Sequence, residues 1–448
     1  MKDLIVIGAG MAGVTAARKC SQAGWDVGIV DALPYGGTCA LRGCDPKKML
    51  RRGAEVIDAA RLMVGKGIDP DGLKINWADL MAHKRTFTDA VPEKMESGLA
   101  GVGVDTLHGQ VRFVDERTLE TSEGTRIEAR HFLIATGSKP RQLEFPGAQL
   151  VADSTDFLEL EDLPDRIVFI GGGYVSFEFA HIAARAGADV TIVDRGDRPL
   201  KNFDPDLVQL LLDRTRKLGI KIHQNADVLD VRGNTSEKVV SLATDGANSS
   251  IACDLVVHGA GRVPAIDDLS LDNAGVEWSE RGVKVHPHLQ SISAPNVFAA
   301  GDAADTSGSP LTPVAVFEGK VAASNMLKGT TTNPDYRGVP SAVFTVPELV
   351  RVGMLEEEAT NAGIDVTTKW TDTSGWFSQR RMGETHSAAK IIYNKQSGQL
   401  LGAHLFGPDY SEVINIVGLA MRLELAPGDL KKMVSAYPST GSDLGSLL

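Results

Sequence analysis

One pattern occurs twice in this chain of 448 residues, and it constrains the fold more than any other feature. The apolar run 4–7 leads into a glycine turn, a helical segment and a second apolar run, and Asp31 follows Gly8 by 23 positions. The same succession starts near residue 167, where Asp194 follows Gly171 by 23 positions. Strand, glycine turn, helix and strand in this order form a βαβ unit whose helix N-terminus binds phosphate. The sequence therefore predicts an α/β fold with two Rossmann-like dinucleotide-binding domains.

The glycines of each turn have separate tasks. Gly8 makes the tight turn, Gly10 lets a diphosphate approach the backbone, and Gly13 lets helix and strand pack closely. Asp31 is placed to accept hydrogen bonds from ribose hydroxyls. In the second copy Gly171 and Gly173 take the first two tasks. Ser176 stands at the third position, and it is small enough to keep the packing.

Composition and charge exclude several classes of partner. Basic side chains number 46 and acidic ones 58, so the net charge is −12, which disfavours nucleic acid or an anionic membrane. No apolar run approaches the ~18 residues of a membrane-spanning helix. Without a basic leader segment, the chain is expected to be cytoplasmic. Four cysteines are too few for a secreted disulfide framework.

Two of the cysteines lie close together in the segment GGTCALRGCDPKK. In a regular helix Cys39 and Cys44 would have Cα atoms about 8.7 Å apart, whereas a disulfide needs less than about 7 Å. A bridge therefore requires a distorted turn, which Gly43 and an early Pro46 can supply. Neighbouring lysines and a helix N-terminus are expected to lower the thiol pKa values. Two buried thiols are the alternative; no metal site is expected, because no second cysteine pair lies nearby.

Other segments indicate the rest of the architecture. Residues 50–100 have a helical pattern, and 104–135 alternate as in an antiparallel meander. A second β-rich stretch covers 227–258. After residue 338 the pattern is α+β, with an apolar helix over 410–425. Cys20 and Cys253 lie in apolar surroundings and are expected in the core.

These motifs, in this order, resemble the class I pyridine nucleotide–disulfide oxidoreductases, the flavoenzyme group of glutathione reductase, dihydrolipoamide dehydrogenase and mercuric reductase. Besides the segments above, the resemblance rests on LIATGSKP (133–140), GGGYVSFE (171–178), GRVP (261–264), AAGDAA (299–304), LTPVA (311–315) and PSAVFTVPELVRVG (340–353). It implies an FAD-binding domain over 1–149 and 265–336, an NAD(P)-binding domain over 150–264, and an α+β dimerisation domain over 337–448. A cytoplasmic homodimer is implied.

The resemblance also assigns cofactors and residues. FAD would occupy the first glycine turn and NAD(P)H the second, where Tyr174 would cover the nicotinamide pocket. Further cofactor-binding residues by resemblance are Gly37, Thr38, Lys48, Thr136, Gly137, Gly261, Arg262, Asp302 and Thr312. Cys39 would be the thiol that meets substrate and Cys44 the thiol against the flavin. Lys47 or Lys48 would pair with Glu178 near the flavin ring.

The choice of coenzyme depends on the loop after the second βαβ unit. Asp194 suits the free ribose hydroxyls of NADH. Arg195 and Lys201 match positions where NADPH-using relatives carry cations for the 2′-phosphate. Two cations against one acid favour NADPH, with NADH as the alternative.

The C-terminal segment departs from the family. Disulfide reductases of this group carry His-Pro-Thr-x-x-Glu there, and the histidine serves the partner subunit as acid–base. Tyr437 stands at the histidine position and Ser442 at the glutamate position, and the last histidine of the chain is His404. A phenol with an ordinary pKa near 10 is a poor base at neutral pH. Asp443 lies one position from the missing glutamate and is a weak substitute.

Four functions remain open at this point. The leading one is NADPH-dependent reduction of an unidentified small or protein disulfide, and Arg18 and Lys320 match substrate-binding cations of glutathione reductase. The second is reduction of a soft metal ion at the two thiolates, since mercuric reductase also carries Tyr at the histidine position. The third is direct transfer from flavin to a quinone, and the fourth is a redox-sensing flavoprotein without turnover.

Overall fold

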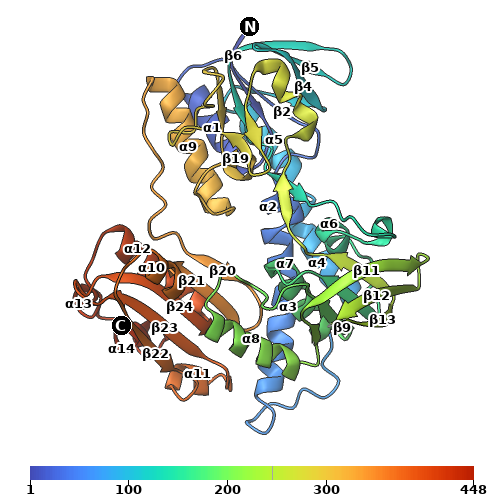
Figure 1. Ribbon diagram of the computed structural model, residues 1–448, viewed down its shortest axis with the longest axis vertical. Helices are drawn as coiled ribbons and strands as arrows, with labels where there is room; N and C mark the ends of the chain where they lie inside the picture. Colours follow the sequence, from blue (N-terminus) through green and yellow to red (C-terminus); the bar gives the residue numbers. More distant parts are fainter. Residues whose placement is uncertain (245) are drawn as a thin grey trace. The chain divides into compact units, whose positions relative to one another are not determined.

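The computed structural model describes residues 1–244 and 246–448, and their contacts form two compact units (Figure 1). The first unit contains Met1–Lys48, Ala82–Arg141 and Gly261–Tyr336. The second contains Met49–Met81, Gln142–Ala260 and Arg337–Leu448. Each unit is assembled from three separate stretches of chain. The assignment of three domains by sequence stays a prediction.

The first unit is built on a largely parallel sheet. In spatial order its parallel strands are β3 (Val104–His108), β2 (Val27–Asp31), β1 (Lys2–Ile7), β6 (Arg126–Ile134) and β18 (Val297–Ala299). Leu4 and Val6 point to one apolar cluster and Ile5 and Ile7 to another. Because both faces are covered, the strand is apolar at every position rather than at alternate ones.

Helices cover one face of this sheet. Figure 1 shows α1 (Met11–Gln22) and α9 (Thr312–Lys328) side by side, although almost 300 residues separate them in the sequence. Ala16, Ala17 and Cys20 of α1 are buried in the cluster that these helices form with β1. The small side chains let the two helices approach closely. The prediction that Cys20 is a core residue is confirmed, and burial raises its pKa to about 12.

The meander predicted over 104–135 is partly wrong. The strands β4 (Val111–Asp115), β5 (Thr118–Thr121) and the first part of β6 are antiparallel, as expected. However, β3 pairs parallel with β2 and belongs to the main sheet. It is the edge strand there, so one side of it stays exposed and its sequence alternates as a half-buried antiparallel strand does.

The helices within residues 50–100 are shorter than the sequence pattern predicts. The stretch 50–100 contains α3 (Cys44–Leu62), α4 (Trp77–Thr88) and α5 (Val91–Ala100), but residues 63–76 form turns. Gly65, Gly67 and Gly72 have positive φ there, which interrupts a helix. None of the helices in residues 1–244 and 246–448 has the length and apolar character needed to cross a membrane.

The second unit repeats the βαβ arrangement. Its parallel sheet has the order β10 (Lys221–His223), β9 (Asp189–Val193), β8 (Arg166–Ile170) and β14 (Leu255–His258). Helices α7 (Tyr174–Ala186) and α8 (Pro205–Lys217) contribute to its core. The antiparallel strands β11 (Ala226–Gly233), β12 (Lys238–Thr244) and β13 (Ala247–Cys253) confirm the predicted β-rich stretch. Cys253 is buried, as predicted.

The C-terminal part of the second unit is α+β, as predicted. Its sheet has the order β20 (Ser341–Val343), β21 (Glu348–Gly353), β24 (Leu400–Gly407), β23 (Ala388–Asn394) and β22 (Val366–Asp372). Helix α12 (Tyr410–Arg422) buries Val413, Ile414 and Val417 against this sheet. The apolar periodicity over 410–425 therefore reflects packing within the subunit. Leu419 and Leu423 of the same segment stay exposed.

Candidate functional site

The two glycine turns have nearly the same backbone, which confirms the predicted duplication. Gly8 has a φ of +105° and Gly171 a φ of +107°, a region that other residues adopt only at a cost. Gly10 and Gly173 precede their helices with φ of −81° and −86°. No side chain caps α1 or α7. The first N–H groups of both helices are therefore left to hydrogen-bond an anion.

Contacts around the first turn show why glycine is needed. A Cβ atom at Gly8 would lie 2.4 Å from the Ala135 carbonyl oxygen, and one at Gly13 would lie 2.0 Å from the Gly8 carbonyl oxygen. A Cβ atom at Gly10 would meet nothing nearer than 4.0 Å. The turn is thus closed at its two ends and open at its centre. This is the shape that a diphosphate needs to reach the backbone.

Polar groups next to this turn fit a dinucleotide. The Asp31 carboxylate accepts the backbone N–H of Ala9 at 2.7 Å, which places it beside the turn. The Thr136 hydroxyl oxygen is buried and has no hydrogen-bond partner among the described residues. Ser138 donates to Asp302 at 2.8 Å. A buried hydroxyl without a partner is costly in a finished structure, so it favours a bound polar group here.

Sequence reasoning missed one residue that holds this region together. Glu318 on α9 is buried and accepts hydrogen bonds from the Gly301 N–H at 2.6 Å, the Thr306 hydroxyl at 2.9 Å and the Tyr336 hydroxyl at 2.6 Å. These bonds hold the segment that contains Asp302. Burial raises the Glu318 pKa, and the hydrogen bonds oppose that rise. An acid inside an apolar helical stretch, FEGKVAA, was the available signal.

The cysteine pair lies where two helices meet. Cys39 is on α2 (Gly37–Arg42), the break falls at Gly43, and Cys44 begins α3. The predicted distortion at Gly43 is confirmed, and a Cβ atom there would lie 2.9 Å from the Thr38 carbonyl oxygen. No disulfide joins the two cysteines in this structure. The Cys44 sulfur lies 3.9 Å from the Thr312 hydroxyl oxygen at the start of α9.

The expected lowering of the thiol pKa values is wrong for Cys39. Its pKa is raised, first because it shares a hydrogen bond with Cys44 and then because it is partly buried. The negative charges of Cys44 and Asp45 add to the rise, and the Thr312 hydroxyl opposes it. The neighbouring lysines do not overcome these effects. Because the two thiols are within hydrogen-bonding reach of each other, they are close enough to cooperate in dithiol–disulfide chemistry.

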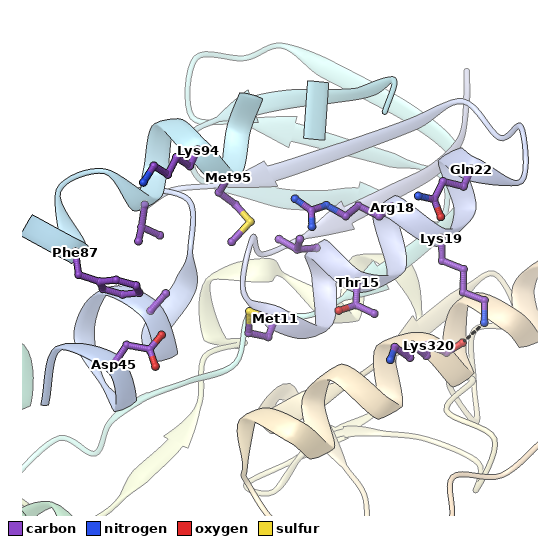
Figure 2. A pocket seen from close by; sticks show the side chains of 13 residues that line it. Met11, Thr15, Arg18, Lys19, Gln22, Asp45, Phe87, Lys94, Met95 and Lys320 are labelled. Carbon is purple, nitrogen blue, oxygen red and sulfur yellow. Dashed lines mark hydrogen bonds between the residues drawn. The ribbon is translucent and has the colours of Figure 1, made fainter. Parts of the chain in front are cut away.

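A pocket of about 750 Å³ adjoins the cysteine segment (Figure 2). Ala40 and Asp45, each next to one of the cysteines in sequence, line it. Figure 2 shows Asp45 and Phe87 on one side, and Arg18, Lys19 and Lys320 on the other. The apolar part of the wall includes Met11, Val14, Phe87, Val91 and Met95. Sequence reasoning named Arg18 and Lys320 but missed Asp45, Phe87 and Lys94.

Three cations of this pocket have no acidic partner among the described residues. Arg18, Lys94 and Lys320 form no ion pair with any acid that the structure describes. Lys19 instead donates to the Lys320 carbonyl oxygen at 3.1 Å. The Nε atom of Arg18 is buried and has no hydrogen-bond partner among the described residues. In a chain with a net charge of −12, this positive pocket is suited to anionic groups.

The second glycine turn keeps the same packing with serine at its third position. Ser176 is fully buried, and its hydroxyl oxygen is 2.1 Å from where a Cβ atom at Gly259 would lie. A glycine at 259 thus makes room for the serine. Asp194 is buried as well, and its carboxylate lies against Gly172 of the turn. This position beside the turn is the one predicted for a ribose-binding acid.

The cations of the coenzyme loop differ in their surroundings. Lys201 forms an exposed ion pair with Asp197 at 3.2 Å. Arg198 donates to the carbonyl oxygens of Phe203 and Lys201 and so closes the loop. Arg195 forms no ion pair with the described residues and is exposed. Of the two predicted phosphate-binding cations, Arg195 is the one whose charge is available.

Glu178 is held on α7 within the second unit. Its side chain is buried, and it accepts the Phe344 N–H at 2.9 Å. One turn further along, His181 accepts the Val346 N–H at 3.3 Å, and Arg185 donates to the Val346 carbonyl oxygen at 2.7 Å. Three consecutive turns of α7 are thus tied to residues 344–346. The predicted ion pair of Glu178 with Lys47 or Lys48 stays a prediction.

The C-terminal segment carries no histidine that could replace the missing base. Tyr437 is 83% exposed. Ser442 shares reciprocal hydrogen bonds with Ser439, and Asp443 accepts the Ser378 hydroxyl. His404 is buried, and its ring bonds the Met354 carbonyl oxygen at 2.9 Å. Burial lowers the His404 pKa to about 4, so it is neutral and enclosed.

Comparison with known proteins decides the family. Residues 2–319 match the family model described as pyridine nucleotide-disulphide oxidoreductase, and residues 339–446 match the dimerisation domain of these proteins. The chain belongs to the pyridine nucleotide-disulphide oxidoreductase family. It is therefore a flavin-dependent enzyme of a family that uses FAD and NAD(P)H, and the matched dimerisation domain indicates a homodimer. The glycine turn, the Thr136 hydroxyl and Asp31 fit FAD at the first site.

Similar proteins in this family include enzymes with different names. Dihydrolipoyl dehydrogenase of Bacillus subtilis is 30% identical over 98% of this chain and 94% of its own length. Mercuric reductase of Staphylococcus aureus is 30% identical over 97% of this chain and 80% of its own length. A solved Cu(II) complex of the HOCl-induced flavoprotein disulfide reductase RclA from Escherichia coli has a TM-score of 0.88 and 29% identity, and the match covers 100% and 98% of the two chains.

Proposed function

We propose that this enzyme uses NADPH to reduce a disulfide substrate through the Cys39–Cys44 pair. The observation that carries the proposal is the placement of two mutually hydrogen-bonded thiols at a break between helices, beside a pocket large enough for a small molecule. When bound, FAD accepts hydride equivalents from the nicotinamide and makes them available to the cysteine pair. The protein holds the thiols together, and Thr312 contacts the sulfur of Cys44.

The pocket supports a substrate that is anionic and partly apolar. Arg18, Lys94 and Lys320 surround a wall that also presents Phe87 and Met95. Carboxylates on a disulfide would meet the cations, and its carbon skeleton would meet the apolar side chains. Low-molecular-weight acidic thiols have this chemistry. A cationic disulfide would be repelled by the same groups.

NADPH is favoured over NADH by the charge at Arg195. The 2′-phosphate of NADPH would sit near the end of β9, where Arg195 is exposed and has no acidic partner among the described residues. Lys201 would have to exchange Asp197 for the phosphate. Asp194 is turned toward Gly172, so its charge is less able to oppose a phosphate.

The test is an anaerobic titration of the purified holoenzyme with NADPH and, in parallel, NADH. A long-wavelength absorption band at two electrons, lost in Cys44→Ser, is expected, because it reports a Cys44 thiolate against the flavin. NADPH is expected to produce it faster. Bleaching of the flavin without the band would refute transfer to the cysteine pair. A band that forms faster with NADH would refute the choice of coenzyme only.

Reduction of a metal ion is the second candidate. Two observations favour it: Tyr437 replaces the acid–base histidine, and similar proteins include a mercuric reductase and a reductase solved as a Cu(II) complex. Electron transfer to a metal ion does not require protonation of a leaving thiolate. Steady-state assays with hydroxyethyl disulfide, Cu²⁺ and a quinone, each with wild type and Cys39→Ser, separate the candidates. Turnover of the disulfide that is lost in Cys39→Ser supports disulfide reduction. Turnover of Cu²⁺ but not of the disulfide, lost in the same variant, supports the metal ion. Turnover of the quinone that is independent of the cysteine supports direct transfer from the flavin.

A further inference from the structure

Asp45 differs from the other charged groups of the pocket. It is the one acidic side chain among the described residues that line the pocket, and it directly follows Cys44. It lies in the first turn of α3 and is partly buried. Figure 2 shows it across the pocket from Arg18. The cations facing the same space come from three helices: Arg18 and Lys19 from α1, Lys94 from α5 and Lys320 from α9.

Asp45 is not used as a structural ion-pair partner. Its carboxylate forms no ion pair with any described residue, although four cations share its pocket. An acid at a helix N-terminus is normally kept ionised by the helix dipole. Here burial raises the Asp45 pKa instead. The carboxyl group therefore holds a proton more readily than an ordinary surface aspartate.

The charge of Asp45 also acts on the reactive thiol. It is one of the groups that raise the Cys39 pKa, after the hydrogen bond to Cys44 and burial. A proton that leaves Cys39 for Asp45 removes this opposing charge, so protonation of Asp45 and ionisation of Cys39 favour each other. None of the ten histidines, all of them described, lines this pocket. Asp45 is thus the titratable oxygen acid next to the cysteine pair.

We propose that Asp45 is a catalytic residue that carries protons between the Cys39–Cys44 thiols and the thiolates released from the disulfide substrate. The proposal rests on the proposed disulfide reductase function and adds the proton path that the C-terminal segment lacks.

Each step balances in protons and electrons. Cys39 gives its proton to Asp45 and attacks one substrate sulfur, so a Cys39–substrate disulfide forms and the substrate disulfide breaks. The released thiolate leaves with the bonding electrons and takes the proton from Asp45. Cys44 then gives its proton to Asp45 and attacks Cys39. The second thiolate leaves and is protonated in the same way, so one substrate disulfide becomes two thiols and the enzyme pair becomes a disulfide.

The leaving thiolate provides a sharp test. Hydroxyethyl disulfide releases a basic alkyl thiolate that needs a proton, whereas dithiobis-nitrobenzoate releases a weakly basic aryl thiolate that leaves without one. Asp45→Asn keeps the shape but cannot carry a proton. We expect it to lower kcat for the alkyl disulfide about 10²-fold, the lower end for general acid–base catalysis. For the aryl disulfide we expect a change in kcat of less than about 3-fold, because its thiolate leaves without a proton and because Cys39 ionises more readily once the Asp45 charge is gone. Asp45→Glu should restore most of the alkyl rate.

A second readout needs no substrate. Iodoacetamide alkylation of Cys39 in the reduced holoenzyme, followed by mass spectrometry against pH, reports the thiolate fraction. Loss of the Asp45 charge should lower the Cys39 midpoint, so alkylation at neutral pH becomes several-fold faster in Asp45→Asn while disulfide turnover becomes slower. A merely structural residue would slow both reactions. Glu93→Gln on α5, which removes an exposed carboxylate outside the pocket, is the matched control and should change neither.

The outcomes distinguish the two proposals. Equal loss with both disulfides, or no loss with either, overturns the role of Asp45 while leaving disulfide reduction intact. An unchanged Cys39 midpoint in Asp45→Asn also overturns it. If wild type reduces neither disulfide although NADPH reduces its flavin, the proposed function fails, and the proton path fails with it.

Discussion

Asp58→Asn would measure what the buried ion pairs of the second unit contribute to its stability. The Asp58 carboxylate accepts hydrogen bonds at 2.7 and 3.0 Å from Arg185 and at 2.8 and 2.8 Å from Arg214. Arg185 is fully buried on α7, and Arg214 on α8 also contacts Glu384 at 3.2 Å. Burial lowers the Arg185 pKa to about 10, and Asp58 opposes the lowering. Asp58 thus pairs with both arginines, which have little access to water, and shares Arg214 with Glu384.

The expected loss of stability is large because the two arginines would remain buried without the Asp58 charge. Breaking a buried ion pair by removing one partner costs about 3–5 kcal/mol, since the remaining charge is uncompensated. The asparagine amide can accept from one arginine, but its NH₂ group would face another donor. We expect a free energy of unfolding lower by about 3–5 kcal/mol, which at about 2 °C per kcal/mol for a large unit is a fall of about 6–10 °C in Tm.

The assay is urea unfolding of the holoenzyme, followed by far-UV circular dichroism. Asp254→Asn is the matched control, because Asp254 forms a two-point ion pair with Arg166 at 2.6 and 3.2 Å on the surface. An exposed pair contributes about 0–1 kcal/mol. If the two substitutions lower the free energy of unfolding by the same amount, burial does not determine how much these ion pairs contribute to stability. Arg185→Met should lower the free energy of unfolding less in the Asp58→Asn background than in wild type, because in that background the Arg185 charge has already lost its partner.

Three further predictions concern the turn, the pH and the coenzyme. Gly43→Ala would bring a Cβ atom within 2.9 Å of the Thr38 carbonyl oxygen. We expect this overpacking to lower the free energy of unfolding by about 1–3 kcal/mol and to slow the oxidation of the cysteine pair by diamide. An unchanged oxidation rate would contradict this. The His404 pKa of about 4 lies below its ordinary value near 6.5, so the stability it contributes is complete above pH 6.5 and is lost as the pH falls to 4, by up to about 3 kcal/mol. Urea unfolding at several pH values should show this fall, and His404→Gln should make it shallower; parallel curves would refute it. Arg195→Gln should raise KM for NADPH about 10-fold, as loss of one charge-assisted hydrogen bond implies, and leave KM for NADH unchanged; equal effects on both would assign Arg195 to the loop structure.

The sequence determined the features that depend on local backbone chemistry. The duplicated βαβ unit could be predicted because a glycine turn, an apolar run and a terminal acid each follow from contacts within about 30 residues. The turns at Gly8 and Gly171 have nearly identical φ values, as equal spacing suggested. The break at Gly43 was predictable for the same reason, since the distance between two cysteines in a helix follows from helix geometry.

Tertiary structure decided everything that depends on what a side chain faces. The apolar stripe of α12 could have covered a partner or its own sheet, and only packing against β21 and β24 shows the second. The edge strand β3 alternates like a meander strand, although its pairing is parallel. The raised pKa of Cys39 depends on Cys44, Asp45 and burial together, whereas the sequence displayed only the neighbouring lysines. Only the folded chain shows that Asp45 lies in a pocket with four cations, because α1, α5 and α9, which contribute them, are distant in sequence. Periodicity records that a residue is buried or exposed, but charge and pKa depend on neighbours that only the folded chain brings together.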